Sequence, residues 1–383
     1  MELYHEIKQQ TYAVGKSLCF IINKPVKREI FAAGFRDRIV HHLLFNYMNP
    51  LIERTLIADC YSCRKGKGTL YGIERLKKHI KQCSQNYTQD CYVLKLDIQG
   101  YFMNINRDKL QVQVNSIIDQ YGYLRDESGV RFEDSYRAKL VNYLLPIVIN
   151  NNPTSDCIIK SSPEEWDTLP KDKSLFHSPI NVGLPIGNLT SQLFSNVYLN
   201  KLDQFVTREL KIKHYGRYVD DFFLIHRSKE YLKKAVGILR EFLSAKLGLM
   251  LHPRKIVLQH YKKGVAFLGA IVKPYRVYVN RRIAVNFKNS CLQCEQRLTR
   301  GQEDIPNMAV LHDLRITLNS HLGLLRHFST YKLKSKTLQK IHKVYEYGCF
   351  GTHYNVYLLN KAFCSLLPPG ILKNRRQVYP ALL

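Results

Sequence analysis

The chain has 383 residues, 58 of them Lys or Arg and 31 Asp or Glu, so its formal net charge is +27 at pH 7. Such an excess of positive charge is uncommon in enzymes that act on small metabolites, and it points to a polyanionic partner. Hydrophobic residues make up 45% and charged residues 23%, which excludes a disordered or collagen-like chain and leaves room for two or three folding units.

The positive charge is spread along the whole chain. Residues 1–90 carry a net +7, residues 91–290 carry +12 and residues 291–383 carry +8. A flexible basic arm would concentrate the charge, so the even distribution favours an electrostatic channel lined by several domains. A generally basic, solubilising surface is the alternative.

Membrane, export and disulfide signals are weak. No apolar run approaches the about 18 residues of a membrane span, and Met1–Glu6 is polar, so we expect no membrane association and a soluble intracellular protein. The ten Cys are scattered, which is typical of free thiols in a reducing compartment. Cys60/Cys63 and Cys291/Cys294 could together supply four thiolates to zinc, but no His completes either pair, and packing cysteines are favoured.

The first half of the chain predicts a helix, a basic loop and a buried strand. Residues 36–56 place apolar side chains at helical spacing, and 60–70 form a polar loop with Gly, Lys and Arg. Residues 91–96 form an apolar run that ends at Asp97, which predicts a buried strand with a carboxylate at its end. Residues 148–180 contain several Pro and Asn and predict an irregular excursion.

The second half predicts alternating helices and strands. A tight turn at Gly183–Gly187 leads to a helix from Asn188 to about Val206. Two apolar strands, Tyr215–Val219 and Phe222–Ile225, meet at Asp220-Asp221, and an amphipathic helix follows. Short strands are expected within 265–283, and the last 100 residues are expected to be mostly helical and basic.

Three carboxylates stand at strand ends in this pattern. Asp220 and Asp221 at one hairpin tip repel each other, so a cation is expected beside them, and Asp97 ends a separate strand. Three such acids can hold two Mg²⁺ ions, which prefer oxygen ligands and support in-line nucleotidyl transfer. A bare Asp-Asp pair is also common in polar turns, so the flanking residues must decide between these interpretations.

Several segments, taken in order, resemble the motifs of reverse transcriptases. They are Arg28–Ile30 with Phe35–His41, Cys63–Thr69, Leu96–Phe102, Gly183–Gln192, Tyr218–Asp221, Leu251–Lys255 and Phe267–Gly269. Within that family, Ile186–Gln192, Leu169–Phe176 and Ser320–His327 particularly resemble the enzymes of diversity-generating retroelements, which belong to the lineage of retron and group II intron reverse transcriptases.

The resemblance implies an α+β right-hand polymerase with fingers, a ferredoxin-like palm and a helical thumb. The implied parts are an N-terminal region with fingers (1–90), palm with the first catalytic Asp (91–119), a fingers insertion (120–180), palm with the helix and hairpin motifs (181–284), and a helical thumb with a basic C-terminus (285–383).

The same resemblance assigns the reaction centre. Asp97, Asp220 and the backbone carbonyl of Ile98 would bind two Mg²⁺ ions, with Mn²⁺ as an alternative, and Asp221 would complete the acidic cluster. Lys255 matches a lysine proposed to protonate the pyrophosphate leaving group; a contact to a backbone phosphate is the alternative for it.

The resemblance also assigns the pocket for the deoxynucleoside triphosphate. Phe102 matches an aromatic steric gate that excludes ribonucleotides, and Arg64 with Lys65 or Lys67 would contact the triphosphate. Gln192 would lie near the templating base. Ile186 precedes Gly187 where many relatives have Gln, and loss of that amide puts fidelity in question.

The subclass implies a specific biology. Its enzymes copy a template-repeat RNA, misincorporate opposite template adenine, hold an RNA/cDNA duplex, and work with a small basic oligomeric accessory variability protein in the cytoplasm of a bacterium, encoded there or by a phage. A more faithful retron-like or defence-related reverse transcriptase is the alternative, and a catalytically dead RNA-binding scaffold is a third. The basic C-terminal residues, among them Lys332, Lys334, Lys336, Lys340 and Lys373–Arg376, could serve RNA or a protein partner.

Overall fold

The computed structural model describes residues 2–24, 26–125, 129–300 and 308–360. The chain forms two compact units, Met1–Tyr261 and Lys262–Leu383, here called the N-terminal and the C-terminal unit. Helices and sheets occur in both, as the α+β prediction requires. Among the described residues, no helix combines the length and the apolar character needed to cross a membrane.

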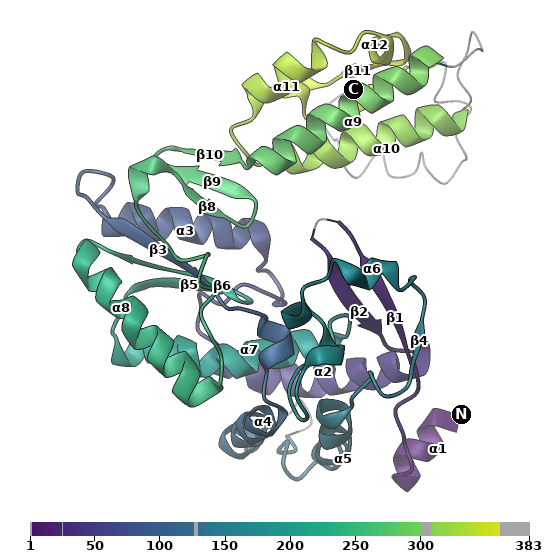
Figure 1. Ribbon diagram of the computed structural model, residues 1–383, viewed down its shortest axis with the longest axis vertical. Coiled ribbons are helices and arrows are strands. Elements are labelled where there is room, and N and C mark those ends of the chain that lie inside the picture. The colour runs from purple at the N-terminus through teal and green to yellow at the C-terminus, as the bar shows by residue number, and fades with distance from the viewer. Residues whose placement is uncertain (1, 25, 126–128, 301–307, 361–383) are drawn as a thin grey trace. The chain divides into compact units, whose positions relative to one another are not determined.

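The N-terminal unit alternates helices and strands (Figure 1). Its helices are α1 (Glu2–Gln9), α2 (Phe35–Thr55), α3 (Thr69–Cys83), α4 (Arg107–Tyr121), α5 (Tyr136–Asn150), α6 (Glu164–Asp167), α7 (Leu189–Gln204) and α8 (Lys229–Phe242). Its strands are β1 (Ser17–Ile22), β2 (Arg28–Ala32), β3 (Tyr92–Asp97), β4 (Cys157–Ile159), β5 (His214–Tyr218), β6 (Asp221–His226) and β7 (Val257–His260). Short 3-10 turns include η1 (Tyr101–Asn104), η2 (Lys171–Lys173) and η3 (Leu175–His177).

Four antiparallel strands form the palm sheet, in the order β5-β6-β3-β7. Helices α4 and α7 lie in the chain between β3 and β5, and α8 lies between β6 and β7, which is the β-α-β-β-α-β arrangement of a ferredoxin-like fold. The sheet lies between α3 and α8 (Figure 1). The predicted ferredoxin-like palm is therefore confirmed.

The hairpin β5–β6 turns one residue earlier than the sequence predicts. Tyr218 and Asp221 already pair across the strands, so Val219 and Asp220 form the two-residue tip. Val219 has a positive φ of 56°, as such tight hairpin turns require. A β-branched residue is strained there, so the surrounding structure must hold it.

A second, smaller sheet and a helical layer complete the N-terminal unit. Strand β1 pairs antiparallel with β2 and parallel with β4. Helix α2 matches the predicted helix; Leu44, Met48 and Leu51 are buried in the main core, whereas Ile39 is exposed. The predicted irregular excursion at 148–180 is present, with only β4, α6 and short 3-10 turns after the end of α5.

The C-terminal unit begins with a small sheet and continues with helices. Its elements are β8 (Val265–Phe267), β9 (Ala270–Lys273), β10 (Arg276–Val279), α9 (Arg281–Arg300), α10 (Met308–Leu325), α11 (Tyr331–Leu338), α12 (Lys343–Tyr347), β11 (Gly348–Phe350) and β12 (Tyr357–Leu359). Cys291 and Cys294 lie in its hydrophobic core with Phe287. The strands expected within 265–283 are confirmed, while the β11–β12 hairpin was not predicted.

Candidate active site

The palm sheet brings two carboxylates directly opposite each other. Asp97 is the last residue of β3 and Asp221 the first of β6, and the two are partners in the strand register. Paired residues of neighbouring strands point to the same face, so both carboxylates share one face of the sheet, next to Asp220 in the hairpin tip. Like charges directly opposite each other destabilise a sheet, so this arrangement requires nearby positive charge.

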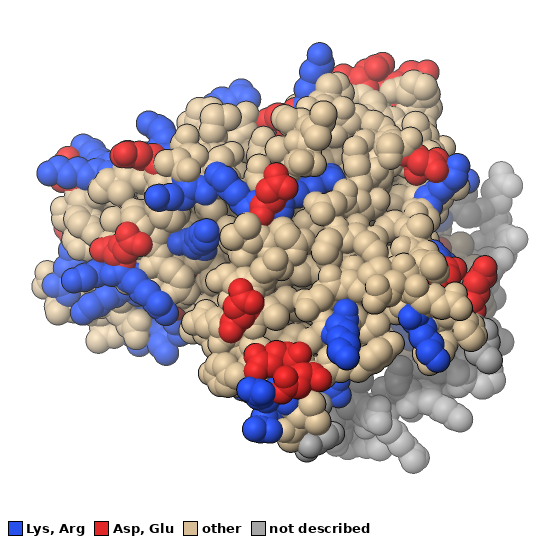
Figure 2. All heavy atoms as spheres, turned by 90° about the horizontal axis from the view of Figure 1, so that it is seen from below, with Lys and Arg blue, Asp and Glu red and all other residues tan. Residues whose placement is uncertain are grey.

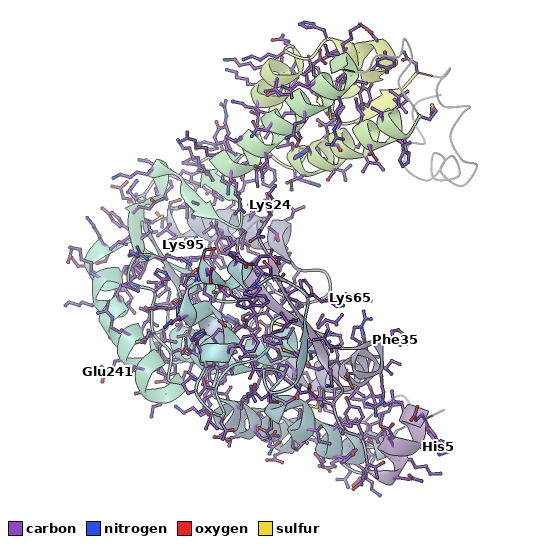
Figure 3. All side chains as sticks on the ribbon, turned by 45° about the vertical axis from the view of Figure 1, so that its right-hand side comes forward. His5, Lys24, Phe35, Lys65, Lys95 and Glu241 are labelled. Atoms are coloured by element: carbon purple, nitrogen blue, oxygen red, sulfur yellow. The ribbon has the colours of Figure 1, made fainter. Side chains whose placement is uncertain are left out.

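Two lysines supply that charge. Lys95 Nζ lies 3.1 Å from Asp221 Oδ2, and Lys255 Nζ lies 2.9 Å from Asp97 Oδ1 and 3.0 Å from Oδ2. Figure 3 labels Lys95, and also Lys65 of the basic loop, which lies elsewhere on the N-terminal unit. Lys95 was not singled out in the sequence, although its position two residues before Asp97 in a strand predicts the same face.

The compensation is incomplete. Burial raises the pKa of Asp220 to about 6, with a further contribution from the Asp97 charge. Burial likewise raises the pKa of Asp221 to about 6, although Lys95 acts against it. Asp221 Oδ1 is buried and has no hydrogen-bond partner among the described residues. These carboxylates therefore favour a further cation or a proton.

A divalent metal would relieve the excess negative charge of these carboxylates. The raised pKa values and the orphaned Asp221 oxygen are what a hard cation would relieve. In the described part of the chain, however, no three His, Cys, Asp or Glu side chains form a ready-made metal cluster. Lys95 and Lys255 occupy carboxylate oxygens that a metal would need.

The hydrogen bonds on either side of Ile98 fix the direction of its carbonyl. The flanking ladder bonds run from Gln99 N–H to Met250 C=O at 2.9 Å and from His252 N–H to Asp97 C=O at 2.8 Å. Because successive peptide groups of an extended strand point to opposite sides, the Ile98 carbonyl faces the β6 side, where the hairpin tip lies.

The strained Val219 is held by both of its backbone groups. Its carbonyl accepts a hydrogen bond from Arg217 Nη1 at 3.0 Å, and its N–H donates to Ser62 Oγ at 3.2 Å. Ser62 in turn donates to Asn196 Oδ1 of α7 at 2.9 Å. The basic loop, helix α7 and the hairpin thus fix the residue that immediately precedes Asp220.

A fully buried ion pair lies beneath the hairpin. The side chains of Arg217 and Asp203 are 0% exposed, and their closest atoms, Nη2 and Oδ2, are 2.6 Å apart. Asp203 also accepts a hydrogen bond from Tyr215 Oη at 2.7 Å. Sequence reasoning missed this pair, because α7 and β5 both contain other polar side chains and no local spacing relates Asp203 to Arg217.

The basic loop directs Arg64 inward. Its guanidinium donates to both Glu53 oxygens, with distances of 2.6 to 3.0 Å, and to the carbonyls of Ile57 and Cys60. The side chain is only 8% exposed and most of its donors bind within the loop, so Arg64 holds the loop in shape, and its contact to a triphosphate stays a prediction. Lys65, assigned to the same contact, is exposed.

The assigned pocket residues converge from separate segments. The Phe102 carbonyl accepts a hydrogen bond from Leu184 N–H at 2.8 Å, and the Ile186 carbonyl accepts one from Phe31 N–H at 2.8 Å. Phe102 and Ile186 are partly buried against one small hydrophobic cluster. Gly187 has φ +130°, and a Cβ there would lie 2.8 Å from the Phe31 carbonyl oxygen, so only glycine fits.

Gln192 and the loop cysteines lie near each other at the start of α7. Gln192 is exposed, and its Oε1 accepts a hydrogen bond from the exposed Cys63 Sγ at 3.0 Å. Cys60 is buried and donates to Asn196 instead. The two thiols of this C-x-x-C pair therefore have different partners.

Residues 27–272 match the family described as "Reverse transcriptase (RNA-dependent DNA polymerase)". The match spans the fingers and palm motifs and every residue assigned above to the reaction centre and nucleotide pocket. It covers more than half of the chain.

Individual relatives are distant. Protein YkfC of Escherichia coli K12 is 22% identical over 277 residues, which cover 63% of this chain and 62% of that protein. Telomerase of Candida albicans, solved with a fragment of telomeric RNA, is 12% identical with a TM-score of 0.46, covering 88% of this chain and 60% of its own. Apo telomerase of Candida tropicalis is 14% identical with a TM-score of 0.46, covering 86% and 59%. The chain thus spans about three fifths of these relatives.

Proposed function

The chain belongs to the reverse transcriptase (RNA-dependent DNA polymerase) family, and on that premise we propose that it synthesises DNA on an RNA template. The observation that carries the proposal is the meeting of Asp97, Asp220 and Asp221 at the adjoining ends of β3 and β6. Carboxylates with raised pKa values on a sheet face suit two-metal nucleotidyl transfer.

Asp97, Asp220, Asp221 and the Ile98 carbonyl would hold two Mg²⁺ ions, or Mn²⁺ in their place. When bound, these ions activate a 3′-hydroxyl and neutralise the triphosphate. Lys255 lies on Asp97 and, once displaced from it, can donate a proton to the departing pyrophosphate. Phe102 would exclude a ribose 2′-hydroxyl, Lys65 would contact the triphosphate, and Gln192 would lie beside the templating base.

The finer proposal is an error-prone enzyme of a diversity-generating retroelement. Ile186 supports it, because an aliphatic side chain beside Gly187 offers no hydrogen bond with which to check the nascent pair. The template would be a template-repeat RNA copied with misincorporation opposite adenine. The enzyme would act in the cytoplasm of a bacterium, together with a small basic oligomeric accessory protein. A more faithful retron-like enzyme is the second candidate.

Basic side chains of the C-terminal unit support RNA as a partner. A groove of about 490 Å³ between α9 and α11 is lined by Lys288, Lys332, Lys336 and Lys340, with no acidic residue among its described lining. Lys334 is not part of it, because its Nζ donates to Asn355 at 2.7 Å. The Lys373–Arg376 cluster lies outside the described residues.

The basic charge is not uniform over the surface. On the face shown in Figure 2, Lys and Arg are scattered among acidic and uncharged side chains and form no continuous stripe. Phosphate contacts at the lysine groove lead us to expect an RNA affinity that falls steeply with salt, with a slope that decreases by about one for each groove lysine replaced by Gln. A flat salt dependence would contradict the proposed phosphate contacts.

Primer extension tests the function directly. The protein is given a primed, adenine-containing RNA template, Mg²⁺ and four deoxynucleotides, beside an Asp220→Ala/Asp221→Ala variant, and the products are sequenced. DNA that depends on these aspartates, with errors concentrated at template adenine, supports the mutagenic enzyme. Accurate DNA supports the retron-like alternative. No DNA, even with cellular RNA and candidate accessory proteins, contradicts the polymerase and favours an RNA-binding scaffold.

A further inference from the structure

Glu29 of β2 is a completely buried carboxylate that no cation neutralises within the described structure. It is 0% exposed. Its Oε1 accepts the Leu175 backbone N–H at 2.7 Å, and its Oε2 accepts Ser174 Oγ at 2.7 Å and Trp166 Nε1 at 2.8 Å. A buried charge is costly unless hydrogen bonds satisfy it, and here all three donors come from residues 164–178, called the anchored segment.

The anchored segment lies on the backbone that follows Asp97. Gln99 Nε2 donates to Asp172 Oδ2 at 3.1 Å. Gly100 has φ +53°, and a Cβ there would lie 2.6 Å from the Asp172 carbonyl oxygen. The segment therefore presses against the turn between Asp97 and Phe102, in a space that only glycine leaves open.

The same segment also contacts the loop before α7. A Cβ on Gly183 would lie 2.5 Å from Leu175 Cδ1, and Ser178 Oγ donates to the Met103 carbonyl at 3.0 Å. Leu175 is buried with Cys19, Phe31 and Met103. The anchored segment thus joins the two loops that carry Phe102 and Ile186.

Phe102 and Ile186 rest on that small cluster. Both pack against it, together with Trp166 and Cys157, and Phe102 also packs against the main core that contains residues of α7 and α8. Its geometry depends on where Leu175 and Trp166 lie, and Glu29 holds both through hydrogen bonds. A displacement of the segment would move the two side chains proposed to face the sugar and the nascent pair.

We propose that Glu29, through the segment that it anchors, is a positioning residue that sets nucleotide selectivity at this site. The inference rests on the proposed polymerase function and extends it to Glu29, which lies in the motif segment Arg28–Ile30 but has no role assigned to it above. The ligand of the site is the deoxynucleoside triphosphate. Glu29 would affect the discrimination between sugars and between bases rather than phosphoryl transfer itself.

The first readout does not require polymerase activity. Trp166 is the single Trp of the chain, so intrinsic tryptophan emission reports on this node. Glu29→Gln places an amide N–H₂ where Trp166 or Leu175 requires an acceptor. We expect a red-shifted emission and faster proteolytic cleavage within 164–178, while the circular dichroism of the whole chain is retained. An unchanged emission maximum would overturn the anchoring step.

The second readout is selectivity. We measure kcat/KM for a deoxynucleotide and its ribonucleotide, and for correct and incorrect nucleotides opposite adenine, in Glu29→Gln and Trp166→Phe. The deoxy-to-ribo ratio should fall about 10-fold in Glu29→Gln and about 3-fold in Trp166→Phe, which keeps a ring but loses one hydrogen bond. An equal loss of kcat/KM for all nucleotides, with unchanged ratios, would show a merely structural role and reject the proposal.

Asp37→Asn is the matched control. Asp37 is another buried carboxylate of the N-terminal unit, bonded to Tyr12 Oη at 2.8 Å and to Gly15 N–H at 3.1 Å, and its Oδ1 lies 3.6 Å from Arg36 Nη1. It should lower the melting temperature without changing either ratio. If the wild-type protein makes no DNA, the polymerase proposal fails by itself, whereas the emission and proteolysis results still decide whether Glu29 anchors the segment.

Discussion

The two faces of the palm sheet treat buried charge in opposite ways. On one face, Asp203 and Arg217 form a 0% exposed pair with every closest contact near 2.6 to 2.7 Å. On the other, Asp97, Asp220 and Asp221 collect like charge, and two of them have a pKa raised to about 6. The charges of Asp203 and Arg217 are fully paired, whereas the three carboxylates have too few cations around them to balance their charge.

This difference distinguishes a structural ion pair from carboxylates that can bind a ligand. A saturated ion pair gains nothing by binding a ligand, while a cluster of under-compensated carboxylates gains from any cation that enters. Val219 connects the two, because Arg217 holds its carbonyl and Asp220 follows it in the chain. The buried ion pair on one face therefore holds the hairpin tip that presents the carboxylates on the other face. Substitutions on each face separately can test this comparison.

The largest effect is expected from Asp220→Asn. Primer extension should fall by about 1,000-fold or more, because a metal ligand is lost. The free energy of unfolding should stay equal or rise, because repulsion from Asp97 is relieved. Activity and urea denaturation are measured on the same preparation. A large loss of stability would contradict the view that this carboxylate is under-compensated.

Arg217→Met should show the reverse pattern on stability. Removing one partner of a buried ion pair leaves Asp203 uncompensated and should cost about 3 to 5 kcal/mol in urea denaturation. The double variant Asp203→Leu/Arg217→Met should recover most of this stability. It should still extend primers more slowly than wild type, because the Val219 carbonyl has lost its donor. Full recovery of activity would contradict the view that Arg217 positions the hairpin tip through the Val219 carbonyl.

The pH dependence of stability should separate the contribution of Asp220 from that of the half-buried His214. The pKa of Asp220 is raised from 3.8 to about 6, so its contribution to stability falls as pH rises through that window, by at most about 3 kcal/mol. Burial and the neighbouring His79 lower the pKa of His214 from 6.5 to about 4, so stability is lost as pH falls through 6.5.

The two contributions change stability in opposite directions as the pH rises, and variants can separate them. In Asp220→Asn/Asp221→Asn, thermal denaturation from pH 4 to 7 should show stability rising with pH more steeply than in wild type. His214→Gln should reduce that rise. Identical pH profiles in all three proteins would mean that neither set of groups is perturbed in the folded chain.

The smallest effect is expected from Ser62→Ala. The Val219 N–H loses its acceptor, at a cost of about 1 kcal/mol in unfolding free energy. Extension should slow several-fold, with a change in kcat rather than in KM. Ser84→Ala, which removes a buried hydroxyl that accepts from Tyr87 N–H in the same unit, is the control. An equal slowing in both variants would show that Ser62 has no particular role at the hairpin.

Local patterns predicted much of the fold. The helix at 36–56, the strand ending at Asp97 and the hairpin around Asp220 all rest on apolar periodicity within a few residues, and the structure places them within one or two residues of the expected bounds. The tip of the hairpin shifted by one residue because cross-strand pairing extends to Tyr218 and Asp221.

The hydrogen-bond partners of the site residues could not be predicted from such local patterns. The sequence offered Arg64 as a triphosphate contact, yet the fold turns it onto Glu53, a residue of the preceding helix. It offered Glu29 only as part of a motif, although the carboxylate binds a segment about 140 residues later. No local spacing encodes either contact.

The sequence by itself determined the order of the motifs, the alternation of elements and the identity of the three acids, because each depends on residue type and short-range periodicity. Only the tertiary structure decided which cations face those acids, that Asp203 and Arg217 form a buried pair, and that Glu29 accepts hydrogen bonds from Trp166, Ser174 and Leu175. Burial and pairing between distant residues set these outcomes, since the free energy of a charge depends on its surroundings rather than on its neighbours in the chain.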